Sequence, residues 1–388
     1  MIVRPLETVG ANAERSRSHN RQVVLSRVRA AGQIGRAEIA RSSGLSTQAV
    51  SNIIADLLSE DLIVECGRRA GVRGLPAVQY TLNPEGAHAL GVEIRPDALF
   101  AAVLNLGGET LFSRRVALAD THPDHVTDAV LSLRDIALAE NPDAHLLGAG
   151  MVMPGPFGAT GIRESGSELS AWDDVEPARL FSDALNLPVV VENDANAAAM
   201  AERVNGAARG LDTYAFLYFG TGLGLGVVNE GRLVAGTHGN AGEIGHIPVP
   251  SDGAIVPLES AVSRLSVQRA LGNTGVNVES GEDLAQLYAE EYPALSQWLD
   301  RTAEPLSAAV AIIENLFDPQ AIILGGAMPD SLLDHMIAGV SLPDRSVATR
   351  PDRERPRLLR GASGRMTATL GAAALVINQA FTPMIAAR

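Results

Sequence analysis

The sequence predicts a helical N-terminal module followed by a larger α/β body. Three observations support this expectation. Short amphipathic helices with glycine turns fill the first 65 residues, apolar strands alternate with helices after the turn at residues 83–86, and polar or glycine-rich motifs follow several of those strands. Strands that alternate with helices form a mainly parallel sheet covered by helices. The chemistry of such a sheet lies at the carboxyl ends of its strands.

Length and composition indicate a globular protein of more than one domain. At about 150 residues per domain, 388 residues correspond to two or three domains. The single cysteine, Cys66, cannot form an intrachain disulfide, which favours a reducing, cytoplasmic compartment. The N-terminus lacks the apolar stretch of a signal peptide. Asn378, Gln379 and Pro383 interrupt the apolar tail at 371–387, so we expect a packed helix there and no membrane span.

The charge is distributed unevenly between the two parts. All 31 basic residues are arginine, and residues 1–80 carry a net charge of +4, whereas the rest of the chain carries −18. A basic module on an acidic body suggests that only the module binds a polyanion such as nucleic acid. An excess of this size also arises by chance, so charge alone leaves both interpretations open.

The module has the spacing of a helix-turn-helix. Apolar residues recur at helical spacing in 20–31 and 36–42, a turn follows at 43–45, and Ser46 can cap a third amphipathic helix at 48–59. The N-terminal part of that third helix would present side chains to base edges, with an ordinary solvated face as the alternative. The candidate base-reading residues are Thr47, Gln48, Ser51 and Asn52.

A hairpin is expected after the third helix. Residues 62–64 and 78–82 have the composition of strands, and a glycine-rich connection between them carries Arg68, Arg69 and Arg73. Such a wing can place arginine on phosphates or in a minor groove. A solvated loop is the alternative.

The body continues with strands and helices in alternation. A long helical stretch is expected from residue 258 onward and a last helix at the C-terminus. The other expected helices are 127–140 and 178–185, and the expected strands are 89–94, 98–106, 109–116, 146–153, 188–191, 213–219, 224–229 and 321–325.

Five motifs in the body carry a family resemblance. They are PGP (154–156), ENDANAAAMAE (192–202), FGTGLGLG (219–226), GNAGEIGH (239–246) and ILGGAM (323–328). Over residues 86–388 the chain resembles the ROK family, which joins sugar kinases and transcriptional repressors on a two-lobed, actin-like and hexokinase-like fold. The N-terminal winged helix-turn-helix is similar to that of the family's repressors. The resemblance implies a DNA-binding domain at 1–85, a first lobe at 86–191 completed by a helix at 368–388, and a second lobe at 192–367.

The resemblance also implies a sugar-binding set. Asp194 stands where the kinases have the base that deprotonates the sugar hydroxyl, Asn193 would hydrogen-bond the sugar, and Glu168 replaces an asparagine common in the family. Each residue also has an ordinary interpretation: a helix cap for Asn193 or Asp194, a core histidine, or a solvated glutamate. The implied sugar-binding residues are Glu168, Asn193, Asp194, Glu243, His246 and Glu259.

The chain departs from the family's kinases at the first phosphate loop. In the strand that should lead into a glycine turn, Glu93 stands at the aligned position, Ile94 comes next in place of a glycine, and Arg95 and Pro96 follow. A phosphate loop needs glycine for close backbone approach and free N–H donors, and proline removes one donor. The second loop at 220–222 is retained. Since phosphoryl transfer depends on such electrostatic contacts, we expect no useful kinase activity.

The family's structural zinc loop is also altered. No cysteine lies between His246 and Leu258, and tetrahedral zinc needs four cysteine or histidine ligands. We therefore expect no cofactor and no structural zinc.

These expectations combine into a sugar-responsive regulator. We expect a repressor that binds operator DNA as a homodimer or homotetramer and is released when a sugar enters the cleft between the lobes. The sequence leaves open activation instead of repression. The alternatives are an active sugar kinase with a DNA-binding head, and a DNA-binding protein with a vestigial, ligand-free body.

Overall fold

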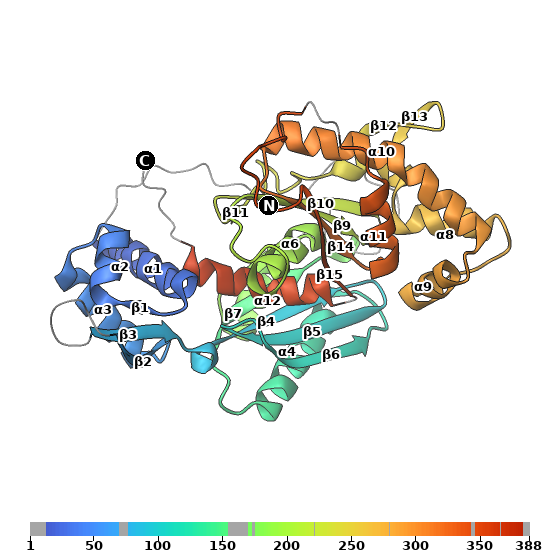
Figure 1. Ribbon diagram of the computed structural model, residues 1–388. Coiled ribbons are helices and arrows are strands. Elements are labelled where there is room, and N and C mark those ends of the chain that lie inside the picture. Colours follow the sequence, from blue (N-terminus) through green and yellow to red (C-terminus); the bar gives the residue numbers. More distant parts are fainter. Residues whose placement is uncertain are drawn as a thin grey trace. The chain divides into compact units, whose positions relative to one another are not determined.

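The computed structural model describes residues 13–69, 77–153, 170–172, 175–220, 222–278, 280–342, 346–364 and 366–382. The chain divides into two compact units, which Figure 1 shows coloured along the sequence. Unit 1 comprises residues 1–151, 166–191 and 372–388, and unit 2 comprises residues 152–165 and 192–371. The three-part division expected from the sequence stays a prediction.

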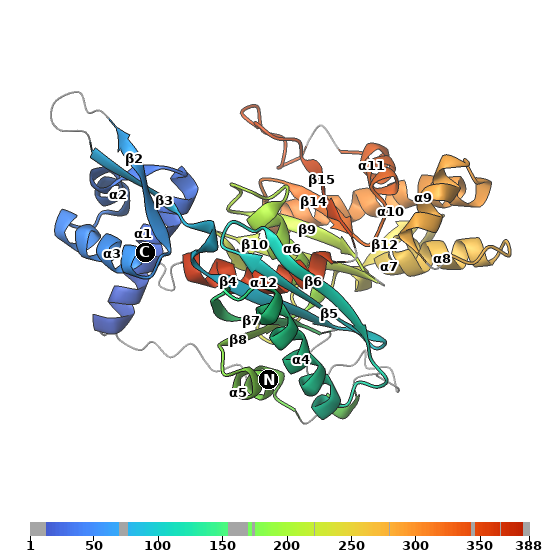
Figure 2. The same cartoon turned by 90° about the horizontal axis from the view of Figure 1, so that it is seen from below.

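The N-terminal part of unit 1, residues 13–82, forms a module that we call the head (Figure 2). Gly44 ends the second helix with a φ of 70°, in the left-handed region that glycine adopts without strain. Ser46 caps the third helix, because its side chain accepts a hydrogen bond of 3.2 Å from the backbone N–H of Ala49. The apolar faces form the core of the head, as the sequence predicted. The helices are α1 (Ala13–Ala31), α2 (Arg36–Ser43) and α3 (Thr47–Ser59).

The first helix is longer than expected, since α1 begins at Ala13 and not near residue 20. Two ion pairs join this extension and the next turn to α3. Arg17 pairs with Asp56 at 3.1 Å, and Nη1 and Nη2 of Arg21 donate to the two carboxylate oxygens of Glu60. The Arg21 guanidinium lowers the pKa of Glu60 by hydrogen bonding to its carboxylate. These pairs connect α1 to Asp56 of α3 and to Glu60, the residue that follows α3.

The wing is present as a three-stranded antiparallel sheet. Its strands are β1 (Ile34–Gly35), β2 (Ile63–Arg69) and β3 (Ala77–Leu82), in the order β1-β3-β2. The helix-turn-helix with this hairpin is a winged helix-turn-helix. A tight turn connects it to the rest of unit 1: the Asn83 side chain donates to the carbonyl of Asp61 at 2.8 Å, and a Cβ at Gly86 would lie 2.1 Å from that same oxygen.

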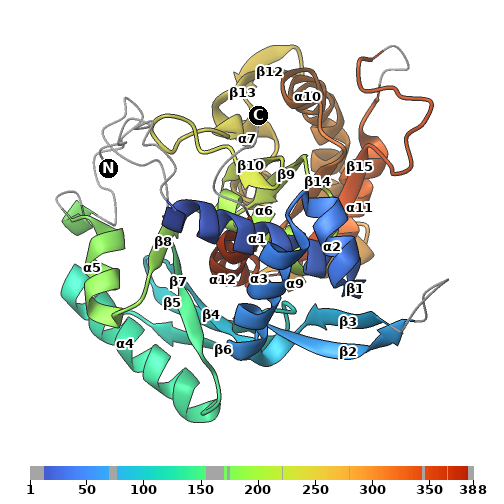
Figure 3. The same ribbon diagram turned by 90° about the vertical axis from the view of Figure 1, so that its left-hand side faces the viewer.

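The remainder of unit 1 is a five-stranded sheet with the order β6-β5-β4-β7-β8. Every residue of β4 and β5 is buried, which means that both faces of these strands are covered. Helix α4 lies along one face (Figure 3). It begins at Pro123, earlier than expected, because proline suits the first turn of a helix. The elements are β4 (His88–Ile94), β5 (Ala98–Asn105), β6 (Thr110–Ala117), α4 (Pro123–Glu140), β7 (Leu146–Val152), α5 (Pro177–Leu185) and β8 (Val189–Glu192).

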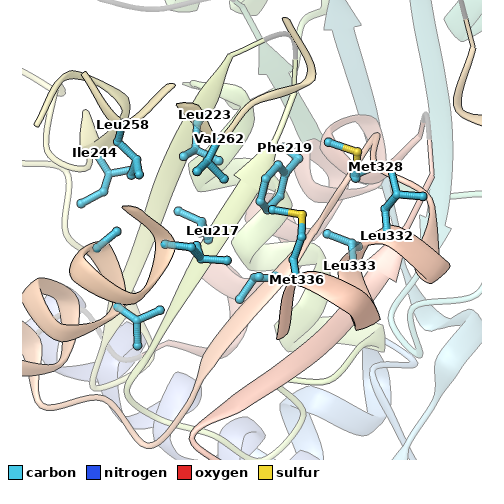
Figure 4. Close-up of a cluster of buried hydrophobic side chains, with 14 of the residues drawn as sticks. Leu217, Phe219, Leu223, Ile244, Leu258, Val262, Met328, Leu332, Leu333 and Met336 are labelled. Carbon is cyan, nitrogen blue, oxygen red and sulfur yellow. The ribbon is translucent and has the colours of Figure 1, made fainter. Parts of the chain in front are cut away.

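Unit 2 is built on a second five-stranded sheet with the order β11-β10-β9-β14-β15. One face carries a buried cluster in which Leu217 and Phe219 lie near Met328, Leu333 and Met336 (Figure 4). Strand β14 is parallel to its neighbours β9 and β15. Strand β10 is antiparallel to its neighbours β9 and β11. The strands are β9 (Tyr214–Phe219), β10 (Leu223–Asn229), β11 (Arg232–Leu233), β14 (Ile322–Gly326) and β15 (Leu358–Ser363).

Helix α6 (Asp194–Asn205) covers the other face of this sheet at very short range. A Cβ at Gly224 would lie 2.7 Å from the Cβ of Ala195, and a Cβ at Gly226 would lie 2.5 Å from the Ala195 carbonyl oxygen. The glycines of β10 therefore pack directly against the alanines of α6, and larger side chains on either element would separate the two. This contact sets the position of the N-terminus of α6 over the sheet.

The long helical stretch expected from residue 258 is several helices. Ser263 and Ser280 each form a capping box that starts a new helix, and Pro293 starts the longest one. These caps make separate helices more stable than one continuous helix. The helices are α7 (Leu258–Ala261), α8 (Arg264–Gly272), α9 (Gly281–Ala289) and α10 (Pro293–Phe317), followed later by α11 (Asp330–Gly339) and α12 (Thr367–Phe381). None of the helices described here is long and apolar enough to cross a membrane.

Candidate functional site

The N-terminus of α6 presents the Asn-Asp pair singled out in the sequence. Asn193 is 9% exposed, and its side-chain oxygen accepts a hydrogen bond of 2.8 Å from the backbone N–H of Asn196. Asp194 uses one oxygen, Oδ1, to accept from the N–H of Ala195 at 2.8 Å. Asn193 is therefore the helix cap, a role that the sequence had left open for either residue. The cap uses only its oxygen, so a sugar contact would come from its amide nitrogen.

The second oxygen of Asp194 lies against the turn between β9 and β10. A Cβ at Gly220 would be 3.2 Å from Oδ2 of Asp194 and 2.8 Å from the ring of Tyr218. A side chain at residue 220 would thus displace the carboxylate or the ring. The glycine is required by this crowding, independently of any role in binding phosphate.

The GEIGH motif folds into a short helix, η3 (Ile244–His246), that is pressed onto β10. Gly242 has a φ of 95°, and a Cβ there would lie 1.9 Å from the carbonyl oxygen of Leu225. A Cβ at Gly245 would lie 2.7 Å from the carbonyl oxygen of Leu223. Both glycines therefore allow backbone-to-backbone contact with the strand, and they place Glu243 and His246 beside it.

Glu243, His246 and Glu259 form a row with the imidazole in the middle. Nε2 of His246 is 3.9 Å from Glu243, and Nδ1 is 3.9 Å from Glu259, which lies on α7. The three side chains are 38%, 38% and 37% exposed. At these separations the imidazole makes no direct hydrogen bond to either carboxylate. Their polar atoms can therefore accept or donate hydrogen bonds to hydroxyl groups.

Burial is the main influence on Glu243. It raises the pKa of this carboxyl, the neighbouring His246 lowers it, and the negative charge of Glu259 raises it again. Glu192, at the end of β8, is also shifted. Burial raises its pKa, while hydrogen bonds from the Asn196 side chain and the Asn193 backbone lower it. Both carboxyls thus retain a proton at higher pH than an exposed glutamate does.

The turn between β9 and β10 brings the two motifs together within unit 2. Gly220 adjoins Asp194, and a Cβ at Gly222, two residues further, would lie 3.0 Å from Oε2 of Glu259. A single glycine turn therefore has one motif's carboxylate at each end. The family resemblance implied Asp194, Glu243, His246 and Glu259 as members of one sugar-binding set, and the structure groups them around this turn. Their role in sugar binding stays a prediction. Glu168 lies outside the described residues.

In unit 1, the region aligned with the first phosphate loop is occupied by an ion pair. Glu93 is 5% exposed and accepts a hydrogen bond of 2.6 Å from Nε of Arg95. The Arg95 guanidinium also stacks 4.3 Å above the ring of Phe100. The charge of Glu93 is therefore compensated by its neighbour, a pairing that the sequence analysis did not anticipate.

The predicted DNA-reading face of α3 is accessible. Thr47, Gln48 and Asn52 are exposed and Ser51 is half-buried. Gln48 donates to Asn52 at 3.0 Å, whereas the Ser51 hydroxyl donates to the carbonyl of Thr47 at 2.8 Å within the same helix. Gln48 and Asn52 therefore form a pre-arranged pair, and Ser51 is engaged by its own helix.

The basic residues of the wing are described only in part. Arg68 lies at the exposed end of β2. The side chain of Arg69 and the whole of Arg73 lie outside the described residues.

Comparison with known proteins confirms the family. The ROK family model matches residues 89–379, and the chain belongs to the ROK family. The xylose repressor of Bacillus subtilis (strain 168) is 25% identical over 325 residues, covering 80% of this chain and 83% of that protein. The bifunctional enzyme NanE/NanK of Brucella suis is 36% identical over 181 residues, covering 46% of this chain and 34% of the enzyme.

Solved structures show the same fold. A ROK family transcriptional regulator, described as a homologue of the Escherichia coli Mlc protein, aligns with a TM-score of 0.74 and 24% identity, covering 95% of this chain and 97% of that one. The ROK hexokinase of Thermus thermophilus aligns with a TM-score of 0.58 and 25% identity, covering 74% and 97%. The body therefore has the actin-like, hexokinase-like fold of the family, and the regulator shares it over nearly the whole chain.

Proposed function

We propose that this chain is a sugar-responsive transcriptional regulator that binds operator DNA through the head and is released when a sugar binds in unit 2. The observation that supports this best is the grouping of Asp194, Glu243, His246 and Glu259 around one glycine turn. Carboxylates and imidazole nitrogens at this spacing can hydrogen-bond adjacent hydroxyl groups of a sugar. The similarity to xylose repressors over most of the chain agrees with this proposal.

In the proposed function, the head is the part of the chain that binds DNA. The exposed Gln48–Asn52 pair near the N-terminus of α3 suits base edges in a major groove, since both amides can pair with adenine. Thr47 and Ser51 beside them would make further polar contacts, and Arg68 on the wing would contact the phosphate backbone. Two heads in a homodimer or homotetramer would bind half-sites about one helical turn apart, or a multiple of it.

The proposal includes loss of kinase activity. A buried Glu93–Arg95 pair and Pro96 stand where the family's kinases place a glycine turn for ATP phosphates. A phosphate would have to displace Arg95 from Glu93 and Phe100, and it would then meet an uncompensated carboxylate. Asp194 would in that case serve as a hydrogen-bond acceptor for a sugar hydroxyl and not as a catalytic base.

The residues that replace the family's zinc loop do not fit zinc. After His246 the chain forms the hairpin β12 (Pro248–Ser251) and β13 (Ala254–Pro257), which contains no cysteine or histidine. Cys66 lies in the wing strand β2, in unit 1. Instead of a metal, the hairpin is supported by packing on α10 and by the Arg301–Asp252 pair at 3.6 Å. We propose that structural zinc is not part of this protein.

A sugar panel tests the proposed function. Operator-like DNA is first selected by the protein from a random pool, and its affinity is then measured with D-xylose, D-glucose, sucrose and N-acetyl-D-mannosamine. We expect one sugar to raise the melting temperature and to weaken DNA binding about 5- to 150-fold. Asp194→Ala removes this response, and Asp300→Ala on α10, which also deletes an aspartate, retains it. Equal DNA affinity with and without every sugar, or a full response in Asp194→Ala, would count against the proposal.

An active sugar kinase with a DNA-binding head is the second candidate. Asp194 lies beside Gly220, at the position that the resemblance gives to the base of the family's kinases, and NanE/NanK is similar to 46% of the chain. A coupled assay for ADP release with the same sugars separates the two candidates. Sugar-dependent turnover that is lost in Asp194→Asn would establish the kinase. A chain that shows neither thermal shift nor turnover would be a DNA-binding protein with a ligand-free body.

A further inference from the structure

Helix α12 is a single buried element that belongs to both units. Residues 367–371 are part of unit 2, and residues 372–381 are part of unit 1. Every residue from Gly371 to Asn378 is buried, so the helix is covered on all sides there. A helix buried on all sides cannot shift without moving the elements that surround it.

In unit 2, α12 is in backbone contact with the helix that carries the candidate sugar site. A Cβ at Gly371 would lie 1.9 Å from the carbonyl oxygen and 2.2 Å from the carbonyl carbon of Ala197. Ala197 is in the first turn of α6, and its N–H donates to the carbonyl of Asn193 at 3.0 Å. The contact with α12 is therefore one helical turn from Asn193 and Asp194.

In unit 1, the next residue of α12 makes an equally close contact. A Cβ at Gly150 in β7 would lie 1.8 Å from the carbonyl oxygen of Ala372, and a Cβ at Gly148 would lie 3.2 Å from the side chain of Val376. Within unit 1, Ala372 of α12 thus touches the backbone of β7, as Gly371 of α12 touches α6 within unit 2. Neither contact has a compressible side chain between the two backbones.

The C-terminal end of α12 is attached to the head. The Gln22 side chain donates to the carbonyl of Gln379 at 3.0 Å, and the Arg29 guanidinium lies 4.6 Å from the centre of the Phe381 ring. Gln22 and Arg29 are both on α1, two helical turns apart, and they therefore lie on the same face of this helix. We call these two contacts the latch. Helix α1 is tied in turn to the DNA-reading helix α3 by the Arg17 and Arg21 ion pairs.

We propose that α12 and the latch transmit sugar binding at α6 to the DNA-binding head, an inference that rests on the proposed function. A sugar that shifts the first turn of α6 moves the Ala197 carbonyl, and Gly371 must follow because no space separates them. The latch then changes the position of α1 and, through it, of α3. Linkage requires the reverse effect as well: DNA bound to the head weakens sugar binding by the same factor.

The test compares variants of the latch with a matched control on the same helix. Gln22→Ala removes the hydrogen bond, and Arg29→Leu removes the cation over the ring. Arg27→Leu is the control, because Arg27 is exposed on α1 and its loss changes the charge of the head equally. The full-length proteins are titrated with the selected DNA, with and without D-xylose or D-glucose, and with each sugar alone.

For the wild type and Arg27→Leu we expect the sugar to weaken DNA binding by a factor within about 5- to 150-fold. In Gln22→Ala and Arg29→Leu that factor falls below about twofold, while the dissociation constant for the sugar alone stays at the wild-type value. Amide hydrogen exchange in α1 gives a second measurement, since the sugar should change it in the wild type and not in the latch variants.

The outcomes separate the inference from the proposed function. A wild type whose DNA affinity does not respond to any sugar refutes the proposed function, and the inference with it. A wild type that responds, with latch variants that respond equally, overturns the role of α12 and leaves the proposed function standing. Loss of sugar binding in the latch variants also overturns it, because transmission would leave the sugar site intact.

Discussion

Replacing Gly242 by alanine tests how the GEIGH motif is positioned. Gly242 has a φ of 95°, and a Cβ at this residue would lie 1.9 Å from the carbonyl oxygen of Leu225, whereas real Cβ atoms essentially never approach another heavy atom closer than 3.0 Å. The loop must therefore move away from β10 by about 1 Å, the difference between those two distances. Glu243 and His246 follow this loop and would move with it.

The expected loss of stability has two parts. A left-handed backbone costs a residue with a Cβ about 1–2 kcal/mol, and overpacking against a fixed backbone costs about 1–3 kcal/mol. Gly253→Ala is the matched control, because Gly253 has a φ of 76° and no atom of the described residues lies within 4 Å of where its Cβ would be. Gly253→Ala should thus lose only the first part, about 1–2 kcal/mol, and Gly242→Ala should lose about 2–5 kcal/mol in total.

The free energy of unfolding is measured in urea from the fluorescence of Trp298, which is buried in unit 2. Trp172→Phe is introduced into every variant to remove the signal from unit 1. Sugar binding is measured in parallel, and a displacement of this size should weaken it about tenfold or more, since misplacement by about 1 Å is costly in polar sites. Equal destabilisation of Gly242→Ala and Gly253→Ala would refute the steric reasoning.

Three further outcomes are expected. Ser46→Ala removes the cap of α3 and should destabilise the head by about 1 kcal/mol, seen as faster amide exchange in α3, with the exposed Ser59→Ala as control. Glu192→Gln should change how stability depends on pH. Burial raises the pKa of Glu192 in the folded protein, so between the unfolded and the folded pKa the folded wild type binds more protons than the unfolded chain, and its stability falls as the pH rises through that window. The variant should lack this fall, and urea unfolding at a series of pH values in which the variant loses as much stability as the wild type would contradict the prediction. Glu314→Ala removes a buried carboxylate that is paired with Arg357 and should cost about 3–5 kcal/mol, measured by urea unfolding; a loss below about 1 kcal/mol, as for an exposed pair, would contradict this.

Much of the secondary structure followed from local sequence signals. The glycine turn at Gly44 and the cap at Ser46 predicted the helix-turn-helix, and residues 89–94 and 98–106 were predicted as strands, which the structure has as β4 and β5. The stretch from residue 258 was correctly predicted to be helical, but its division into several helices was missed because the serine capping boxes that divide it are short. The early start of α1 was missed, since it depends on ion pairs with α3 and not on an apolar pattern.

The residues of the candidate site were expected from the resemblance as one sugar-binding set, but the distances between them were not. Asn193 and Asp194 follow a strand, and Glu243 and His246 follow a glycine, so each could be recognised from its neighbours in the sequence. Nothing local indicates that Gly220 adjoins Asp194 while Gly222 adjoins Glu259. That arrangement depends on the packing of α6 and η3 against the same strand, β10.

The sequence by itself determined the periodicities, caps and glycine turns, and with them the winged helix-turn-helix and the α/β body. These properties depend on residues a few positions apart, whose hydrogen bonds and backbone preferences do not need the rest of the chain. The tertiary structure alone decided which carboxylates share a glycine turn, that Glu93 is paired with Arg95, and that α12 contacts Ala197 within unit 2 and α1 within unit 1. Those outcomes depend on close packing between segments distant in sequence, where one missing Cβ determines how near two backbones can lie.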